Sequence, residues 1–260
     1  MGGEPLIESF DPGNFDQTST TIDNPWFPFA PGTQWVYEGT TTSEGESIPH
    51  RLEFTVTDLT KEIAGIRTLV GWIVDYSDGE LVEKEVAFYA QDDSGTVWYL
   101  GEHPEEYEAG EFVKAPTWIH GIDGATAGIK MPADPQLDGP DFSQGHAPSV
   151  EFTDRGQVSQ MGIETCVPVQ CYQDVLVIDE SNPEEPAVFQ LKFYARGVGN
   201  VRVGWRGETQ DYEELELVTF AQLDAEALAD VRQLALDLEA HAYEISPEVY
   251  GNTEPMAPIQ

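Results

Sequence analysis

The histidine and aspartate side chains between residues 115 and 149 are those whose types and spacing best suit metal chemistry. Two of the five histidines lie in this segment with four aspartates, as His120, His146, Asp123, Asp134, Asp138 and Asp141. Imidazole and carboxylate groups are ordinary ligands of zinc, manganese and iron. Their spacing matches no diagnostic motif, so solvated loop side chains are the more ordinary interpretation. The predicted metal ligands, which would serve a metal-dependent enzyme, are His120, His146, Asp123 and Asp141.

Aromatic side chains offer a second kind of site. They lie on or beside predicted strands, as Trp98, Trp118, Tyr89, Tyr194 and Trp205. Inside a barrel these rings would line a cavity for a small apolar or aromatic ligand. Outside it they would be core residues packed against a helix, which is the more ordinary role for most of them.

Familiar catalytic signatures are missing from the sequence. It contains no Gly-x-Ser-x-Gly elbow and no His-Glu-x-x-His helix. The stretch from Gly124 to Lys130 is no phosphate loop, because its glycines are too close together and no Ser or Thr follows the lysine. Paired carboxylates for glycoside hydrolysis could exist, but the sequence selects no pair among 48 acidic residues.

Two cysteines, Cys166 and Cys171, are separated by four residues. This spacing suits the base of a hairpin loop, where facing Cα atoms come within disulfide range. A disulfide would indicate an oxidising compartment. A metal thiolate site is the alternative, although two cysteines supply only half of a four-ligand shell.

The elements that must position these residues are mostly strands. Apolar stretches joined by short turns with Gly, Asn, Asp or Pro predict neighbouring antiparallel pairs. They cover residues 51–57, 66–76, 81–90, 96–100, 111–114, 150–153, 157–164, 172–179, 188–195, 200–207 and 214–220. Ten or more strands do not remain a flat open sheet, so we predict a mainly β fold: a strongly curved antiparallel sheet or barrel, lipocalin-like or lipoprotein-carrier-like. The comparison concerns the fold alone.

Two stretches of the chain, 66–102 and 169–206, have similar sequence patterns, as expected for a repeated unit. In each, two strands lead to a Phe-Tyr-Ala sequence, at Phe88 and at Phe193, and a glycine-bearing turn and a further strand follow. Internal similarity of this kind marks repeated supersecondary structure. Two similar β blocks are therefore expected, with any site where they meet.

The segment 115–149 lies between these blocks. Connections longer than about 12 to 15 residues are usually lids, binding loops or linkers. This one carries apolar anchors such as Trp118 and Phe142, so we predict an ordered loop over a cavity mouth.

The predicted organisation is a single β domain, 23–221, with appendages at both ends. Residues 1–22 would form an extended arm. In the next stretch prolines fix the backbone around Trp26, Phe27 and Phe29, which would form a plug over one end of the β structure or an aromatic ligand platform. Apolar residues at helical spacing predict an amphipathic helix over 222–246, capped by Asp224 and ended by Pro247. Residues 247–260 are predicted to be a flexible tail.

The charge balance is extreme, with 48 acidic residues against 12 basic ones and a formal net charge of −36. Such a surface repels phosphate, so nucleic acid and anionic lipid are poor partners. Self-repulsion also opposes compaction unless salt or cations screen it. Adaptation to high salt is one interpretation. The other is an acidic surface or structural protein that holds calcium, although neither Asp92-Asp93-Ser94-Gly95 nor Ser77-Asp78-Gly79 fits an EF-hand loop.

One stretch supports a family resemblance: Asp23-Asn24-Pro25-Trp26-Phe27-Pro28, continuing through Pro31-Gly32-Thr33-Gln34-Trp35-Val36-Tyr37-Glu38-Gly39. It resembles a family of uncharacterised secreted bacterial proteins, largely actinobacterial, and the resemblance covers about residues 20–220. Other matching stretches are 88–102, 124–135 and 194–199. The resemblance implies secretion and carries no assigned activity.

Location and function follow as expectations. No apolar run approaches the roughly 20 residues needed to span a bilayer. Met1-Gly2-Gly3 lacks the features of a secretion signal, so an exported protein would already have lost its signal. We predict a secreted or periplasmic protein that binds a small-molecule ligand in a barrel cavity covered by 115–149. A metal-dependent enzyme and an acidic calcium-binding protein are the alternatives, with a divalent cation, calcium or a transition metal, as cofactor or partner.

Overall fold

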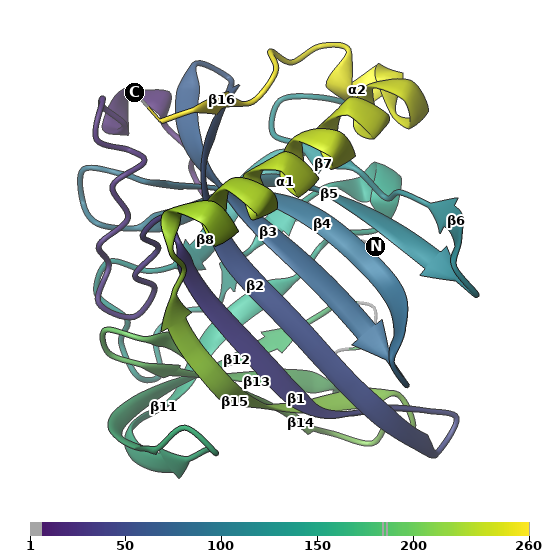
Figure 1. The fold of residues 1–260 in the computed structure, drawn as a ribbon. Coiled ribbons are helices and arrows are strands. Elements are labelled where there is room, and N and C mark those ends of the chain that lie inside the picture. Colours follow the sequence, from purple (N-terminus) through teal and green to yellow (C-terminus); the bar gives the residue numbers. More distant parts are fainter. Residues whose placement is uncertain (1–6, 184, 186, 260) are drawn as a thin grey trace, which may run out of the picture.

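The computed structural model describes residues 7–183, 185 and 187–259, which form one strongly curved antiparallel sheet with a helix across its outer face (Figure 1). The strands are β1 (Thr33–Ser43), β2 (Glu46–Ile63), β3 (Ile66–Ser77), β4 (Glu80–Gln91), β5 (Val97–Glu108), β6 (Glu111–Lys114), β7 (Trp118–Ile119), β8 (Thr126–Met131), β9 (Phe142–Ser143), β10 (Gly145–His146), β11 (Arg155–Cys166), β12 (Cys171–Ser181), β13 (Phe189–Ala195), β14 (Gly199–Arg206), β15 (Tyr212–Gln222) and β16 (Ala257–Pro258). The helices are α1 (Ala225–Ile245) and α2 (Pro247–Tyr250), with 3-10 turns at Pro12–Asn14 and Pro148–Val150.

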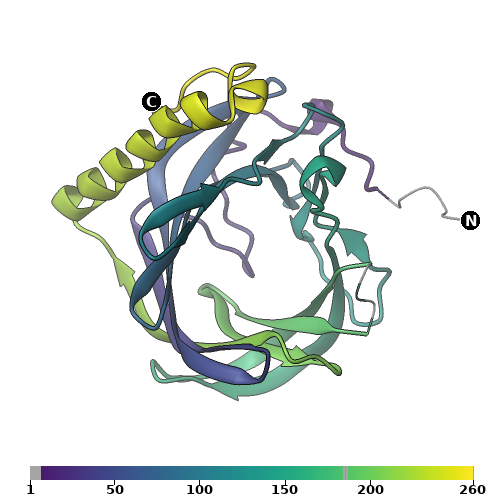
Figure 2. The same cartoon turned by 90° about the vertical axis from the view of Figure 1, so that its right-hand side faces the viewer.

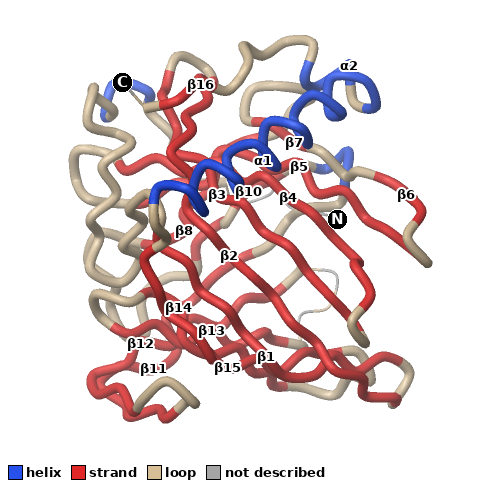
Figure 3. The backbone as a smooth tube through the Cα atoms, viewed as in Figure 1, coloured by secondary structure: helices blue, strands red, loops and turns tan. Residues whose placement is uncertain are grey.

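The strand order follows the chain almost without interruption. Strands β1 to β5 form one antiparallel series and β11 to β15 another, and β1 pairs with β15 to join them. Viewed from the side, the strands curl into a nearly closed ring with α1 lying outside (Figure 2). The backbone tube shows how little of the ring is helical (Figure 3). The predicted mainly β, barrel-like fold with a C-terminal helix is confirmed.

The segment between the two series closes the ring. Strand β8 pairs with β5, β10 pairs with β8, and β9 pairs with β11, so residues 142–146 connect the two edges of the sheet. The backbones meet closely at Gly128, where an added Cβ would lie 2.1 Å from the carbonyl carbon of Gln144. The segment predicted as a covering loop is therefore largely part of the wall, because its apolar residues pair with open strand edges.

The two similar blocks correspond to β3–β5 and β12–β14. Each carries a register shift at the same place, between Phe88 and Tyr89 and between Phe193 and Tyr194. One extra residue in the following strand causes each shift, as in a β-bulge, and a bulge changes which side chains face inward.

Two apolar cores lie on opposite faces of the sheet. The inner one lies within the barrel and includes the aromatic plug, Trp26, Phe27 and Phe29. The outer one packs α1 against β2 and β4, through residues such as Leu59, Phe88 and Leu238. The side chain of Asp224 caps α1 by accepting hydrogen bonds from Glu226 N and Ala227 N. None of the described helices combines the length and the apolar character needed to cross a bilayer.

The C-terminal residues differ from the predicted flexible tail. Helix α2 packs with Tyr250 fully buried, and β16 pairs with β2. Buried Lys61 anchors this segment, since its Nζ lies 2.6 Å from Glu239 Oε1 and 2.8 Å from the carbonyl oxygen of Glu254. The tail is ordered because it covers this ion pair and apolar side chains of the outer core.

The predicted disulfide is confirmed. Cys166 and Cys171 face each other at the end of the β11–β12 hairpin, with Cα atoms 3.9 Å apart, and are bonded.

Candidate functional site

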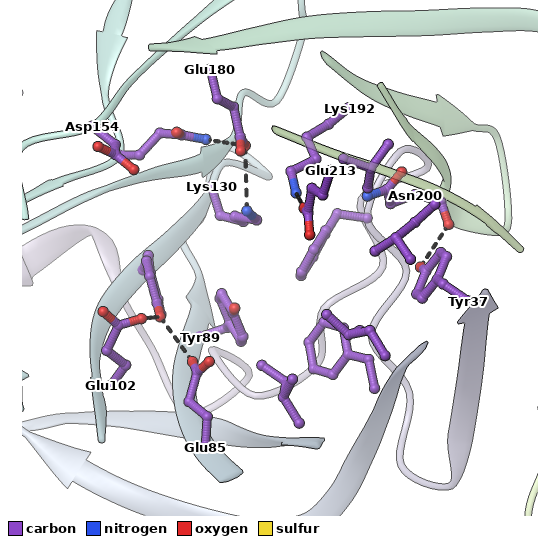
Figure 4. A pocket seen from close by; sticks show the side chains of 18 of the residues that line it. Tyr37, Glu85, Tyr89, Glu102, Lys130, Asp154, Glu180, Lys192, Asn200 and Glu213 are labelled. Atoms are coloured by element: carbon purple, nitrogen blue, oxygen red, sulfur yellow. Dashed lines mark hydrogen bonds and ion pairs between the residues drawn. The ribbon is translucent and has the colours of Figure 1, made fainter. Parts of the chain in front are cut away.

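A cavity of about 270 Å³ lies inside the barrel. Aromatic and aliphatic side chains form part of its wall, and ionisable side chains from both blocks form much of the rest (Figure 4). The ionisable carboxyl and amino groups are Glu83, Glu85, Glu102, Asp154, Glu180, Glu213, Lys130 and Lys192.

The strand alternation directs these charged residues inward. Side chains two residues apart share a face of a strand. Glu83 and Glu85 therefore share the face of buried Tyr89 on β4, and Lys192 shares that of Tyr194 on β13. Strand β5 departs from this alternation, because the bulge at Leu100–Gly101 places both Tyr99 and Glu102 inside.

Carboxyl groups gather on the β4–β5 side of the cavity. The hydroxyl of Tyr99 lies 3.2 Å from Glu85 Oε1 and also contacts Glu102, and Trp118 Nε1 donates to Glu102 Oε1 at 2.9 Å. A hydroxyl has one proton to donate, so Tyr99 can satisfy only one carboxylate at a time. Burial and the neighbouring Glu102 and Asp75 raise the pKa of Glu83 to about 8. Burial also raises the pKa of Glu85 well above its usual range, with Glu102 and Glu83 adding to the effect.

Two lysines balance carboxylates on the opposite side. Lys130 Nζ lies 3.6 Å from Glu180 Oε1, and Lys192 Nζ lies 3.7 Å from Glu213 Oε1. Burial alone would raise the pKa of Glu180, but Lys130 and Lys192 lower it on balance, which favours the ionised form.

Behind Glu213 lies a buried histidine. His50 Nε2 lies 3.3 Å from both Glu213 Oε2 and Asp75 Oδ2. Burial raises the pKa of Asp75 to about 6, although the charge of His50 opposes the shift.

The two repeated tyrosines face the cavity. Tyr89 is 4% exposed and Tyr194 is 1% exposed, and both line the cavity at equivalent positions of the two blocks. Within the described part of the chain neither hydroxyl has a hydrogen-bond partner, whereas Tyr37 donates to Asn200 O at 2.8 Å. Because both residues line the cavity, their hydroxyls are available to a bound molecule.

A second depression, of about 390 Å³, adjoins the cavity and opens beside exposed Glu151. The two spaces share the residues Glu83, Glu85, Glu102, Phe152 and Asp154. Five of the ten residues that line this depression are acidic and none is basic. Carboxyl groups therefore line the passage between solvent and the cavity.

The predicted ligand-binding aromatics divide into two groups. Tyr89 and Tyr194 line the cavity. Trp98 instead faces the outer core, where its Nε1 donates to Asp92 Oδ2 at 2.8 Å. Trp118 lies in the wall behind Glu102, and Trp205 stacks on Tyr212 away from the cavity. The inward carboxyl groups and lysines were not predicted from the sequence, although those on β4 and β13 lie at positions that alternate in step with buried residues.

The predicted metal ligands do not assemble into a metal site. Across residues 7–183, 185 and 187–259 there is no group of three or more His, Cys, Asp or Glu side chains arranged to hold a metal ion. His120 Nδ1 accepts a hydrogen bond from Ala127 N at 3.0 Å, and Asp141 pairs with Arg155. His120 and Asp123 line a separate surface depression, so they are not part of the barrel cavity.

No family model matches the chain, and no curated protein matches it. The predicted kinship with the secreted actinobacterial family therefore stays a prediction. Among solved structures, the chain is similar to a crystal structure of a putative lipoprotein from Parabacteroides distasonis, with 13% identity, a TM-score of 0.35, and coverage of 76% of this chain and 99% of that one.

Proposed function

We propose that the protein binds a small organic molecule with polar groups inside the barrel. The observation that carries this proposal is the pair of hydroxyls of Tyr89 and Tyr194, which face a cavity of about 270 Å³ without a hydrogen-bond partner. Both hydroxyls can therefore hydrogen-bond to a molecule in the cavity, and each such bond contributes about 0.5 to 1.5 kcal/mol.

The size and chemistry of the cavity describe its occupant. A dry apolar cavity of about 150 Å³ holds benzene, and drug-sized ligands need at least about 300 Å³. The occupant is therefore a single-ring or short-chain molecule. Phe27, Phe54 and Tyr99 offer aromatic surface to the small apolar or aromatic ligand predicted from the sequence, but the ionisable groups of the wall favour one that also carries polar groups.

The disulfide supports a secreted or periplasmic location, because such bonds persist in oxidising compartments. In that setting the protein is a carrier or sensor of its ligand.

The test combines a ligand search with a blocked cavity. A panel of soluble compounds below about 200 Da is screened by ligand-observed NMR, and native mass spectrometry examines the purified protein for a retained molecule. Val203 lines the cavity, so Val203→Phe should fill part of it and abolish binding. Val218→Phe makes the same change at a partly exposed position outside the cavity and serves as the control.

The binding test has one supporting outcome and two refuting outcomes. Binding that Val203→Phe removes and Val218→Phe preserves supports an interior site. The proposal is refuted if no compound binds and none is retained, or if both variants bind as the wild type does.

A further inference from the structure

The charges that line the cavity do not balance. Six carboxyl groups face two lysines there. Both lysines already contact carboxylates, since Lys130 pairs with Glu180 and Lys192 with Glu213. Within the described chain, no Lys, Arg or His forms an ion pair with any of the remaining four: Glu83, Glu85, Glu102 and Asp154.

These four carboxyl groups lie along the route into the barrel. All four line both the cavity and the adjoining depression, which has no basic residue in its wall. These groups carry only negative charge when ionised, and an approaching cation favours their ionised form, so such a cleft concentrates cations. The passage therefore favours positively charged molecules over neutral or anionic ones.

The tyrosines provide a separate indication of a ligand beyond these carboxyl groups. Tyr89 is more than nine-tenths buried, faces the cavity and has no hydrogen-bond partner in the described chain. Tyr194 repeats this arrangement in the second block. A ligand that reaches them has a hydrogen-bonding group as well as its charge.

The lining of the cavity suits an organic cation better than a metal ion. The described residues include no group of three or more carboxylates or histidines close enough to coordinate one metal, and the Tyr99 hydroxyl lies between Glu85 and Glu102. Rings of Phe27, Phe54 and Tyr99 line the same space. Ammonium groups bind well against aromatic faces and beside carboxylates.

From these observations we infer that the cavity selects small organic cations: its carboxyl groups Glu83, Glu85, Glu102 and Asp154 bind an ammonium group, while Tyr89 and Tyr194 hydrogen-bond to the rest of the molecule. This inference rests on the proposed binding function and names the class of its ligand. Neutral and anionic molecules of the same size bind more weakly, because only a cation offsets the free-energy cost of ionising these buried carboxyl groups.

Three probes with one scaffold and different charges test the selection. Tyramine is cationic, tyrosol is neutral and 4-hydroxyphenylacetate is anionic at about pH 8. Isothermal titration calorimetry of the wild type should give a Kd for tyramine at least about tenfold below that for tyrosol, and no measurable binding of 4-hydroxyphenylacetate. The preference for tyramine should shrink at high salt, because mobile ions screen the attraction.

Substitutions of the cavity carboxyl groups test whether they cause the preference for tyramine. Glu85→Gln and Glu102→Gln should each weaken tyramine binding by about tenfold and leave tyrosol binding nearly unchanged, because the amide keeps the shape of the side chain but cannot ionise beside the ammonium group. Glu214→Gln removes the same charge at an exposed position of β15 and should leave both affinities as they are.

The failures of the two proposals can be told apart. Equal binding of tyramine and tyrosol by the wild type, or interior binding confined to neutral and anionic compounds of the panel, overturns the cation inference and leaves the binding function standing. An absence of any interior binding overturns both. These outcomes depend on the wild type alone, so they hold even if a glutamine variant fails to fold.

Discussion

Replacing Glu83 by glutamine should make the protein less sensitive to alkaline pH. The pKa of the Glu83 carboxyl rises from 4.5 to about 8 on folding, through burial and the nearby Glu102 and Asp75. Its folded pKa lies above its unfolded pKa, so the folded state binds more protons between these values. The contribution of the protonated Glu83 carboxyl to the free energy of unfolding is fully present below about pH 4.5 and is lost as the pH rises through about 8.

The magnitude follows from the size of the shift. A difference of 3.5 pKa units corresponds to about 4.8 kcal/mol as an upper bound. Water at the cavity mouth and the coupling with Glu85 reduce it, so we expect about 2 to 4 kcal/mol. Glutamine resembles the protonated carboxyl and does not ionise. The variant should match the wild type within about 0.5 kcal/mol near pH 5 and be more stable by about 2 to 4 kcal/mol near pH 9.

Urea denaturation at about pH 5, 7 and 9, followed by tryptophan fluorescence, measures this difference. Glu80→Gln removes the same charge from the exposed start of the same strand and corrects for the general relief of repulsion in this acidic protein. If the free-energy gap between Glu83→Gln and the wild type stays constant from pH 5 to 9, or if Glu80→Gln shows the same gain, the reasoning about Glu83 is refuted.

Three further predictions concern the scaffold. Gly128→Ala should lower the free energy of unfolding by more than about 3 kcal/mol, because the new Cβ would lie 2.1 Å from the backbone of Gln144 and Gly145. The control Gly204→Ala, whose nearest neighbour is 3.7 Å away, should cost far less, and equal losses in urea titrations would contradict the account of barrel closure. Lys61→Met should destabilise the protein by about 3 to 5 kcal/mol, since it leaves the buried Glu239 carboxylate without its ion-pair partner. Hydrogen exchange should then show α1 and residues 247–259 opening first, and an even loss of protection over the chain would contradict the anchoring role of Lys61. Replacing Cys166 and Cys171 together by alanine should cost only about 2 kcal/mol, because the disulfide closes a short loop, and should leave ligand binding intact; a change in affinity would link the hairpin end to the site.

The strand pattern allowed much of the fold to be predicted. Short turns between apolar stretches implied sequential antiparallel pairing, and helical spacing after Asp224 predicted α1, which spans Ala225–Ile245. The pairing of Cys166 with Cys171 was predictable because the two residues are close in the sequence and flank a single hairpin loop. Prediction failed for residues 115–149 and for the C-terminal tail, since the partners of both segments are strand edges and buried groups far away in the chain.

The candidate site was predictable only where the local alternation holds. Tyr89 and Tyr194 keep their phase along their strands, and both were selected. Glu102 was not, because the bulge at Leu100–Gly101 reverses the phase of β5 between Tyr99 and Glu102. Trp98 was selected wrongly for the cavity, since strong aromatic character does not tell which of two buried faces a side chain occupies.

By itself, the sequence determined the β class, the repeated blocks, the disulfide and the helix, because each depends on residues close together in the chain. Tertiary structure decided which side of the sheet became the interior and which charges met there. The six carboxyl groups of the cavity come from four strands and from the turn before β11, and each looks like an ordinary surface acid among 48. Their raised or lowered pKa values, and the shortage of cations around Glu83, Glu85 and Glu102, arise only when the barrel closes and removes water from between them.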